Sequence, residues 1–206
     1  MTSPTPSTDV AQRALDVATQ LFAANGYDGT SLSAIAAEVG VRKPSLLYHF
    51  SSKEELRLAV LRRVFERWND VLPRVLQAAT SGEDRFAGLV SEVVHFFGED
   101  PDRARLLLRE MLDRPELLRE QMSQYVTPWL AILTDYIRRG QDQGHVRPAV
   151  DPHAYLLHVI QLVIGGIATC DVLGAPHPDG TPGDLERHVR ETIRFAHDAL
   201  FIAPLE

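Results

Sequence analysis

The chain has few residues suited to covalent or metal chemistry. Its 206 residues include one cysteine, Cys170, which excludes an internal disulfide and a Cys-x-x-Cys metal site and fits a reducing cytosol. The eight histidines are scattered, and the spacing of His153 and His158 does not place them together on one helical face. The sequence also lacks GxGxxG, HExxH and GxSxG motifs and a P-loop. We therefore expect no enzyme, no cofactor and no metal ion.

The chain also lacks a net positive charge. Its formal charge is -7, which argues against a protein that coats nucleic acid along its whole surface. The charge is uneven, because residues 1–63 hold seven Lys and Arg against six Asp and Glu, whereas residues 64–206 hold fourteen against twenty-two. Any face that binds nucleic acid is therefore expected in the N-terminal third. The first residues have no basic and apolar regions like those of a signal peptide, so we expect a cytoplasmic protein.

Residues 30–53 predict two short helices joined by a tight turn. Thr30 and Ser31 are suited to cap a helix in which apolar residues recur at helical spacing. Gly40 would end that helix, because glycine enters a left-handed turn without steric cost. Pro44 suits the first turn of a second helix that runs to about Phe50. A helix-turn-helix of this kind can place its second helix in the major groove of DNA.

The same stretch carries residue types that bind DNA. Between Gly40 and Lys53 the chain has basic residues and no acid, so attraction to phosphate is unopposed. The first residues of a recognition helix usually face base edges, and a helix N-terminus suits a phosphate. Capping alone would also explain Thr30 and Ser31, and a solvated turn would explain Arg42 and Lys43. The candidate DNA-binding residues are Thr30, Ser31, Arg42, Lys43, Pro44, Ser45, Leu47, Tyr48, His49 and Lys53.

The order of these elements resembles a known family. A predicted helix over residues 9–25 ends in Phe-Ala-Ala-Asn-Gly-Tyr, and Thr30-Ser31, Ile35-Ala36, Gly40-Val41, Leu46-Leu47-Tyr48-His49-Phe50 and Lys53 follow. Over about residues 9–60 this set resembles the DNA-binding domain of the TetR/AcrR family of bacterial transcriptional regulators. The resemblance implies a phosphate contact by Lys53 and a dimer formed through the last two helices. That family more often has its DNA-contacting tyrosine at the position of Leu47, so Leu47 and Tyr48 both remain candidates.

Helical periodicity continues through the rest of the chain and predicts an all-α fold of about nine helices. The later helices are expected over about residues 52–72, 84–98, 100–113, 115–140, 152–168 and 184–201. Pro128 predicts a kink in the fourth of these, and a kink leaves room between helices. The candidate ligand-binding residues are Trp68, Phe97, Met111, Tyr125 and Trp129. Ordinary core packing explains any one of them equally well.

Residues 155–168 are apolar nearly all round. This stretch of fourteen residues is too short to cross a bilayer, which needs about 20, so we expect no membrane contact. A helix that is apolar on every side needs two neighbours, and another subunit would supply the second. Gly165 and Gly166, each costing about 1 kcal/mol in a helix, would then allow a partner helix to approach closely. The candidate interface residues are Tyr155, His158, Val159, Leu162, His188, Thr192 and Ile193.

These patterns predict three segments: a disordered start over residues 1–8, a DNA-binding domain over 9–55, and a ligand-binding and dimerisation domain over 56–206. The expected function is a ligand-responsive DNA-binding transcriptional regulator, a repressor released from a palindromic operator by a small, largely apolar effector. The expected partners are operator DNA, a second copy of the chain and that effector. Two alternatives stay open, namely a helical protein–protein interaction module and a cavity-based enzyme, each with a non-functional helix-turn-helix.

Overall fold

The computed structural model describes residues 6–78, 82–173 and 185–202. These residues form ten α-helices and no β-strand, with one isolated bridge between Val146 and Phe201. The predicted all-α class is confirmed. The predicted loop from Gly174 to Gly183 and the first five residues lie outside the described part of the chain.

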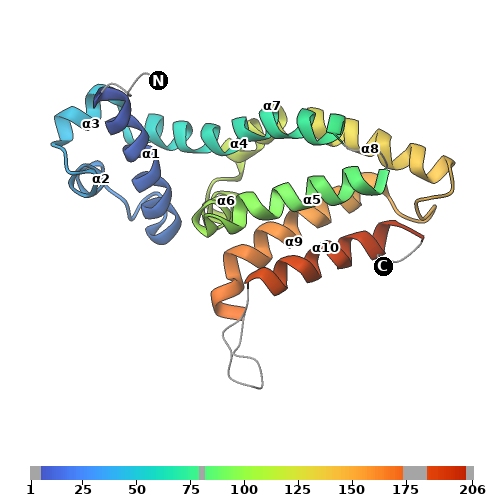
Figure 1. Ribbon diagram of the computed structural model, residues 1–206. Helices are drawn as coiled ribbons and strands as arrows, with labels where there is room; N and C mark the ends of the chain where they lie inside the picture. The colour runs from blue at the N-terminus through green and yellow to red at the C-terminus, as the bar shows by residue number, and fades with distance from the viewer. Residues whose placement is uncertain (1–5, 79–81, 174–184, 203–206) are drawn as a thin grey trace.

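The first three helices form a compact bundle at one end of the molecule (Figure 1). They are α1 (Pro6–Asn25), α2 (Leu32–Val39) and α3 (Lys43–His49). Both predicted signals around α2 are confirmed: the Ser31 side chain accepts a hydrogen bond from the Ala34 amide at 3.0 Å, and Gly40 has φ 80°. The bundle is held by fully buried apolar side chains that include Ala14, Ala18, Phe22, Ile35 and Leu46.

Helix α4 (Lys53–Ala78) joins this bundle to the rest of the chain, and Figure 1 shows it running from the bundle along the larger domain. Leu56, Val60 and Leu61 are fully buried along it. The helix is longer than predicted because Pro73 lies inside it and does not end it. The long apolar stripe of α4 supplies packing that offsets the backbone hydrogen bond lost at a proline.

The remaining helices are α5 (Gly82–Gly98), α6 (Pro101–Asp113), α7 (Pro115–Tyr125), α8 (Thr127–Asp142), α9 (Pro152–Leu173) and α10 (Leu185–Leu200). The single helix predicted over residues 115–140 is wrong, because Val126 interrupts it and separates α7 from α8. Pro128 therefore lies in the first turn of α8, where the missing amide costs no helical hydrogen bond. This break accounts for ten helices in place of about nine.

Helix α9 corrects the expected length of the apolar helix near the C-terminus. It has 22 residues, and by length and composition alone its segment Pro152–Val172 is long enough to cross a membrane. The core helix of a soluble protein meets the same criterion, and α9 packs against α5, α6, α8 and α10. However, only 22% of this segment is buried within the subunit. Most of the other apolar residues of α9 are half-buried, and Val172 is exposed.

Candidate nucleic-acid interface and cavity

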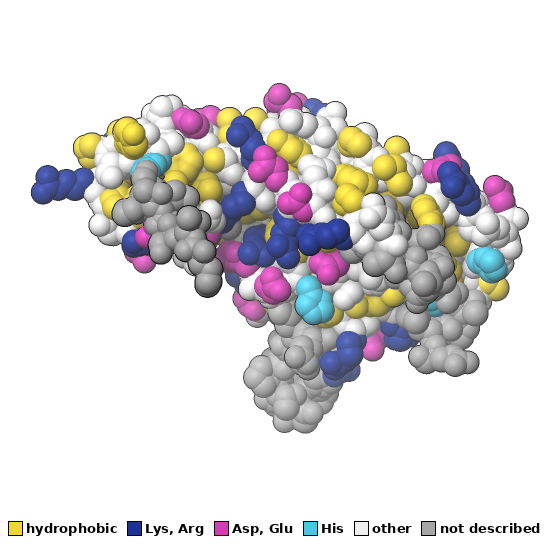
Figure 2. All heavy atoms as spheres, turned by 45° about the horizontal axis from the view of Figure 1, so that its top comes forward, with side chains coloured by type: hydrophobic (Ala, Val, Ile, Leu, Met, Phe, Trp, Pro, Cys, Tyr) yellow, Lys and Arg dark blue, Asp and Glu magenta, His cyan; other side chains and the backbone are white. Residues whose placement is uncertain are grey.

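Helix α3 presents most of its predicted contact residues to solvent. Arg42, Lys43, Pro44 and Ser45 are exposed at its start, and Tyr48 is 84% exposed one turn later. Leu46 and Phe50 are buried and anchor the opposite side of the helix in the bundle. The i, i+4 spacing of these two anchors fixes which face points outward. Figure 2 shows a Lys or Arg side chain projecting from the end of the molecule that this bundle forms.

The outward face is electrostatically suited to phosphate. Within the described residues, no carboxylate lies within ion-pair distance of Arg42, Lys43 or Lys53. Leu47 and His49 are half-buried beside the exposed face, and the rings of Tyr48 and His49 meet edge to face at 5.4 Å between centroids. The predicted DNA-binding residues of α3 and its preceding turn therefore share one end of the molecule.

Thr30 and Ser31 differ from one another in the structure. Ser31 is exposed at the start of α2 and caps it. Thr30 is 2% exposed, and its hydroxyl lies 2.9 Å from the Gly26 carbonyl oxygen and 3.0 Å from that of Leu21, to which it can donate. The structure thus places Thr30 inside the bundle, where its side chain fixes the α1–α2 connection and has no access to a phosphate. The sequence pattern did not separate these neighbours, because both are good capping residues.

Two residues to which the sequence assigned no role hold the recognition end in place. Arg13 of α1 donates a hydrogen bond to the Val39 carbonyl oxygen at the end of α2. Tyr27, in the turn after α1, has the Lys53 ammonium 4.1 Å and the Arg114 guanidinium 4.2 Å from its ring centroid. Both contacts join segments that are distant in sequence, so local periodicity carried no signal for them.

Helix α6 fastens the larger domain to the helix-turn-helix bundle through charged side chains. Arg57 of α4 and Glu110 of α6 form a buried ion pair, with the Arg57 Nε atom 3.0 and 3.1 Å from the two carboxylate oxygens. Burial is the largest single influence and lowers the pKa of the guanidinium, but the hydrogen bonds that Arg57 donates to Glu110, together with the negative charges of Glu110 and Glu54, raise that pKa overall. Arg109 donates to the carbonyl oxygens of Ala23 and Ala24 at the end of α1. One helix is thus bonded to both α1 and α4.

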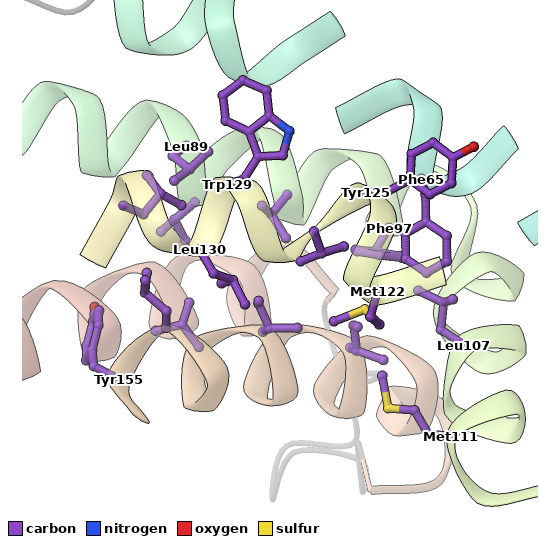
Figure 3. A pocket seen from close by; sticks show the side chains of 18 of the residues that line it. Phe65, Leu89, Phe97, Leu107, Met111, Met122, Tyr125, Trp129, Leu130 and Tyr155 are labelled. Atoms are coloured by element: carbon purple, nitrogen blue, oxygen red, sulfur yellow. The ribbon is translucent and has the colours of Figure 1, made fainter. Parts of the chain in front are cut away.

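Helix α6 also lines an apolar cavity of about 140 Å³, through Leu107 and Met111. Figure 3 shows side chains from several helices converging on this space, with Tyr155 near one end and Met111 near the other. Helices α4 to α9 all contribute to its wall. Among the residues that line it, none carries a charge. A cavity of this kind suits an apolar ligand group.

Most of the predicted ligand-binding residues lie together in this wall: they are Phe97, Met111, Tyr125 and Trp129. The side chain of Trp68 lies outside the described part of the structure. Two polar atoms of the lining are already bonded, because Trp129 Nε1 donates to Asn69 at 2.8 Å and the Tyr155 hydroxyl donates to the Ala196 carbonyl at 2.6 Å. Phe97 was the only lining residue predicted on α5, and Phe86, Leu89 and Val93 of the same helix also line the cavity.

The predicted interface residues divide into two groups. Tyr155 and Thr192 are buried inside the subunit, where they cannot meet a partner, and Val159 lines the cavity. His158 is exposed, whereas Leu162, His188 and Ile193 are half-buried. On α9, His158, Leu162, Gly165, Thr169 and Val172 follow one another at helical spacing and form one outward stripe.

The two glycines of α9 have different surroundings. A methyl group at Gly166 would lie 2.1 Å from the His188 ring of α10, so this glycine admits a side chain of the same subunit. A methyl group at Gly165 would have no atom within 4 Å. Both glycines were predicted to admit a partner helix, and within the described structure only Gly165 has the open space for one.

The structure has an exposed basic helix that follows a glycine turn, and the bundle that carries this helix is bonded to a helical domain with an apolar cavity. These features are those of the helix-turn-helix class of regulators. Residues 14–60 match the family model for bacterial regulatory proteins of the tetR family, and residues 107–181 match the tetracyclin repressor-like C-terminal domain. The chain belongs to the TetR family of bacterial transcriptional regulators, as the sequence resemblance indicated.

Among curated relatives, the chain is similar to the biofilm operon icaADBC negative transcriptional regulator IcaR of Staphylococcus epidermidis. The two are 28% identical over 134 residues, which is 64% of this chain and 69% of IcaR. It is also 26% identical over 193 residues to the transcriptional activator FasR of Mycolicibacterium smegmatis, covering 93% of this chain and 83% of FasR. These relatives are transcriptional regulators rather than enzymes.

Solved structures share the fold over nearly the whole chain. The ketosteroid transcriptional regulator KstR2 of Mycobacterium tuberculosis superposes with a TM-score of 0.74 at 16% identity, covering 94% of this chain and 95% of KstR2. AibR, solved in complex with isovaleryl coenzyme A and operator DNA, superposes with a TM-score of 0.71 at 21% identity. The match covers 95% of this chain and 100% of the AibR chain.

Proposed function

We propose that the chain is a ligand-responsive transcriptional repressor that binds a palindromic operator in the cytoplasm of a bacterium. The observation that carries this proposal is the exposed start of α3, where Arg42, Lys43 and Ser45 face solvent and no carboxylate of the described residues lies within ion-pair distance of the two cations. Arginine and lysine at the start of a recognition helix can bond to guanine O6 and N7, and Ser45 can bond to a base or phosphate. Lys53 and Ser31 add phosphate contacts beside them.

The regulator acts as a homodimer through α9 and α10. The apolar segment Pro152–Val172 is only 22% buried within one subunit, and its outward stripe includes Leu162 and Val172. Phe195 and Ile202 are exposed at the neighbouring C-terminal helix and its end. Two copies packed through these helices would form a four-helix bundle. Their recognition helices would then meet half-sites about 34 Å apart, or a multiple of that distance.

A small, largely apolar effector binds in the cavity that helices α4 to α9 line. The cavity has no charged lining, so the group that enters it is neutral and apolar, while any polar part stays at the opening. The AibR structure, whose ligand joins a short acyl group to coenzyme A, supports an effector of this two-part kind. Binding favours a dimer in which the recognition helices have the wrong spacing, and so releases DNA.

The proposal is tested by DNA binding across a salt series with non-specific competitor. The duplexes come from the region that flanks the protein's own gene and, in parallel, from a random library. We expect binding that resists competitor at two chains per palindromic site. Binding that high salt abolishes and that selects no sequence from the library would contradict a regulator and favour an interaction module. A selected duplex then serves to screen apolar compounds for release of the protein.

A further inference from the structure

Tyr27 lies where three parts of the molecule meet. It follows α1 in the turn before α2, and its ring contacts Phe22 at 5.8 Å between centroids. Three cationic groups lie near this ring: Lys53 at 4.1 Å, Arg114 at 4.2 Å and Arg57 at 5.0 Å from the centroid. Lys53 begins α4, and Arg114 lies between α6 and α7.

The three cations differ in what else they contact. Arg57 is bonded to Glu110 and Glu54, and Arg114 lies 3.5 Å from the carboxylate of Asp28. In the part of the chain that the structure describes, Lys53 has no carboxylate partner within ion-pair distance. Its positive charge is therefore available to an external anion, and the ring of Tyr27 is the group that holds it.

The Tyr27 ring can stabilise the positive charge of Lys53 at its position in α4. Lys53 is the first residue of α4, where the helix dipole disfavours a positive charge. The electron-rich face of an aromatic ring attracts an ammonium group and so opposes that effect. Lysine also has a long, flexible side chain, and a side chain already held in its bound position loses less entropy on binding.

We propose that Tyr27 is a positioning residue for DNA binding, whose ring holds the Lys53 ammonium where it meets a phosphate. The inference rests on the proposed function, because it assigns Tyr27 a part in the same DNA-binding surface. Tyr27 acts through Lys53 and makes no contact with a base. The ring alone carries this role, so Tyr27→Phe keeps it and Tyr27→Leu removes it.

The first experiment needs no DNA. The chain has two lysines, Lys43 and Lys53, so lysine labelled with ¹³C gives two sets of side-chain signals. We expect the ε-methylene protons of Lys53 to be shifted upfield by the ring, with exposed Lys43 as the internal reference. Tyr27→Leu should move the Lys53 signal to the Lys43 position, and Tyr27→Phe should not. A Lys53 signal that is unchanged in Tyr27→Leu would overturn the proposal.

The second experiment is a double-mutant cycle on a duplex that the unmodified protein selects from a random library. A cation–π contact at an exposed site corresponds to about 2- to 5-fold per subunit, so Tyr27→Leu should weaken binding of the dimer by about 4- to 25-fold. In the Lys53→Gln background it should have no further effect, and Tyr27→Phe should bind within about 2-fold of the unmodified protein. Circular dichroism checks that each variant is folded at the assay temperature.

The outcomes separate this inference from the proposed function. A Tyr27→Leu effect of the same size with and without Lys53 would show a purely structural role and overturn the inference, while leaving the regulator intact. A protein that selects no duplex would contradict the proposed function and with it any role of Tyr27 in DNA binding. The lysine signals would then still report whether the ring holds Lys53.

Discussion

At the scale of single residues, the recognition end combines exposed contact groups with buried anchors. Leu46 and Phe50 fix α3 in the bundle, so substitutions on its outer face leave the core untouched. Arg42 is exposed, and its side chain makes no capping hydrogen bond to α3. Its side chain can therefore serve DNA alone, which separates binding from stability in a mutant.

Arg42→Ala is expected to weaken operator binding by about 1–3 kcal/mol per half-site, because an arginine that bonds to a base edge carries about that much discrimination. The thermal unfolding midpoint should stay unchanged. The matched control is Arg139→Ala, an exposed arginine on α8 that pairs with Asp135. Fluorescence anisotropy measures the operator affinity of both variants. If Arg42→Ala binds the operator as tightly as Arg139→Ala does, Arg42 makes no contact with DNA.

At the scale of helices, α6 connects the cavity to the DNA-binding bundle. Leu107 and Met111 line the cavity, while Arg109 and Glu110 bond to α1 and α4. An effector that displaces the cavity wall therefore acts on a helix that is already bonded to the bundle. The buried pair between Arg57 and Glu110 is the part of this connection that is least tolerant of change. Removing Glu110 leaves buried Arg57 paired only with the more exposed Glu54, and removing Arg57 leaves Glu110 buried without its counter-ion.

Glu110→Ala is expected to lower the free energy of unfolding by about 3–5 kcal/mol, because Arg57 would remain buried without that carboxylate. The control is Glu116→Ala, which breaks an exposed pair with Arg119 and should cost less than about 1 kcal/mol. Urea unfolding measures both. Replacing both members of the buried pair by apolar residues should restore most of the loss, and equal small effects of Glu110→Ala and Glu116→Ala would contradict this account.

At the scale of the whole molecule, the outward side of α9 and α10 is the surface that we propose for a second copy of the chain. The stripe of α9 from His158 to Val172 lies beside α10, where Phe195 is 64% exposed. An isolated subunit exposes the apolar side chains of Val172 and Phe195 to water, whereas a symmetric dimer through this surface would bury both copies of each. The same dimer would hold two recognition helices at a fixed spacing.

Phe195→Glu is expected to raise the dimer dissociation constant by at least tenfold, roughly 1.4 kcal/mol, because a charge would be buried at the centre of the contact. Operator affinity should fall with it. Ile132→Glu on α8 is the control, as Ile132 is 46% exposed on another helix. Sedimentation analysis over a concentration series reports the dimer, and an unchanged dissociation constant for Phe195→Glu would place the interface elsewhere.

The sequence by itself determined the helix-turn-helix, because its signals are local. A cap at Ser31, a glycine with positive φ at position 40 and a proline in the first turn of α3 each act within a few residues. The apolar spacing that buries Leu46 and leaves Arg42 outside is local as well. Part of the cavity wall was also predicted from the sequence, namely Phe97, Met111, Tyr125 and Trp129, because bulky apolar residues at helical spacing mark the inward faces of helices.

Only the tertiary structure decided which residues meet across the chain. Thr30 is buried inside the bundle, although its neighbour Ser31 is exposed. The helix predicted over residues 115–140 is interrupted at Val126. His188 packs against Gly166, whereas the space beside Gly165 is open. The tertiary structure also brought Tyr27 to Lys53 and Arg57 to Glu110. Side chains as far apart in sequence as Arg57 and Glu110 become neighbours through packing of whole helices, and that packing depends on many buried contacts together, which no local pattern records.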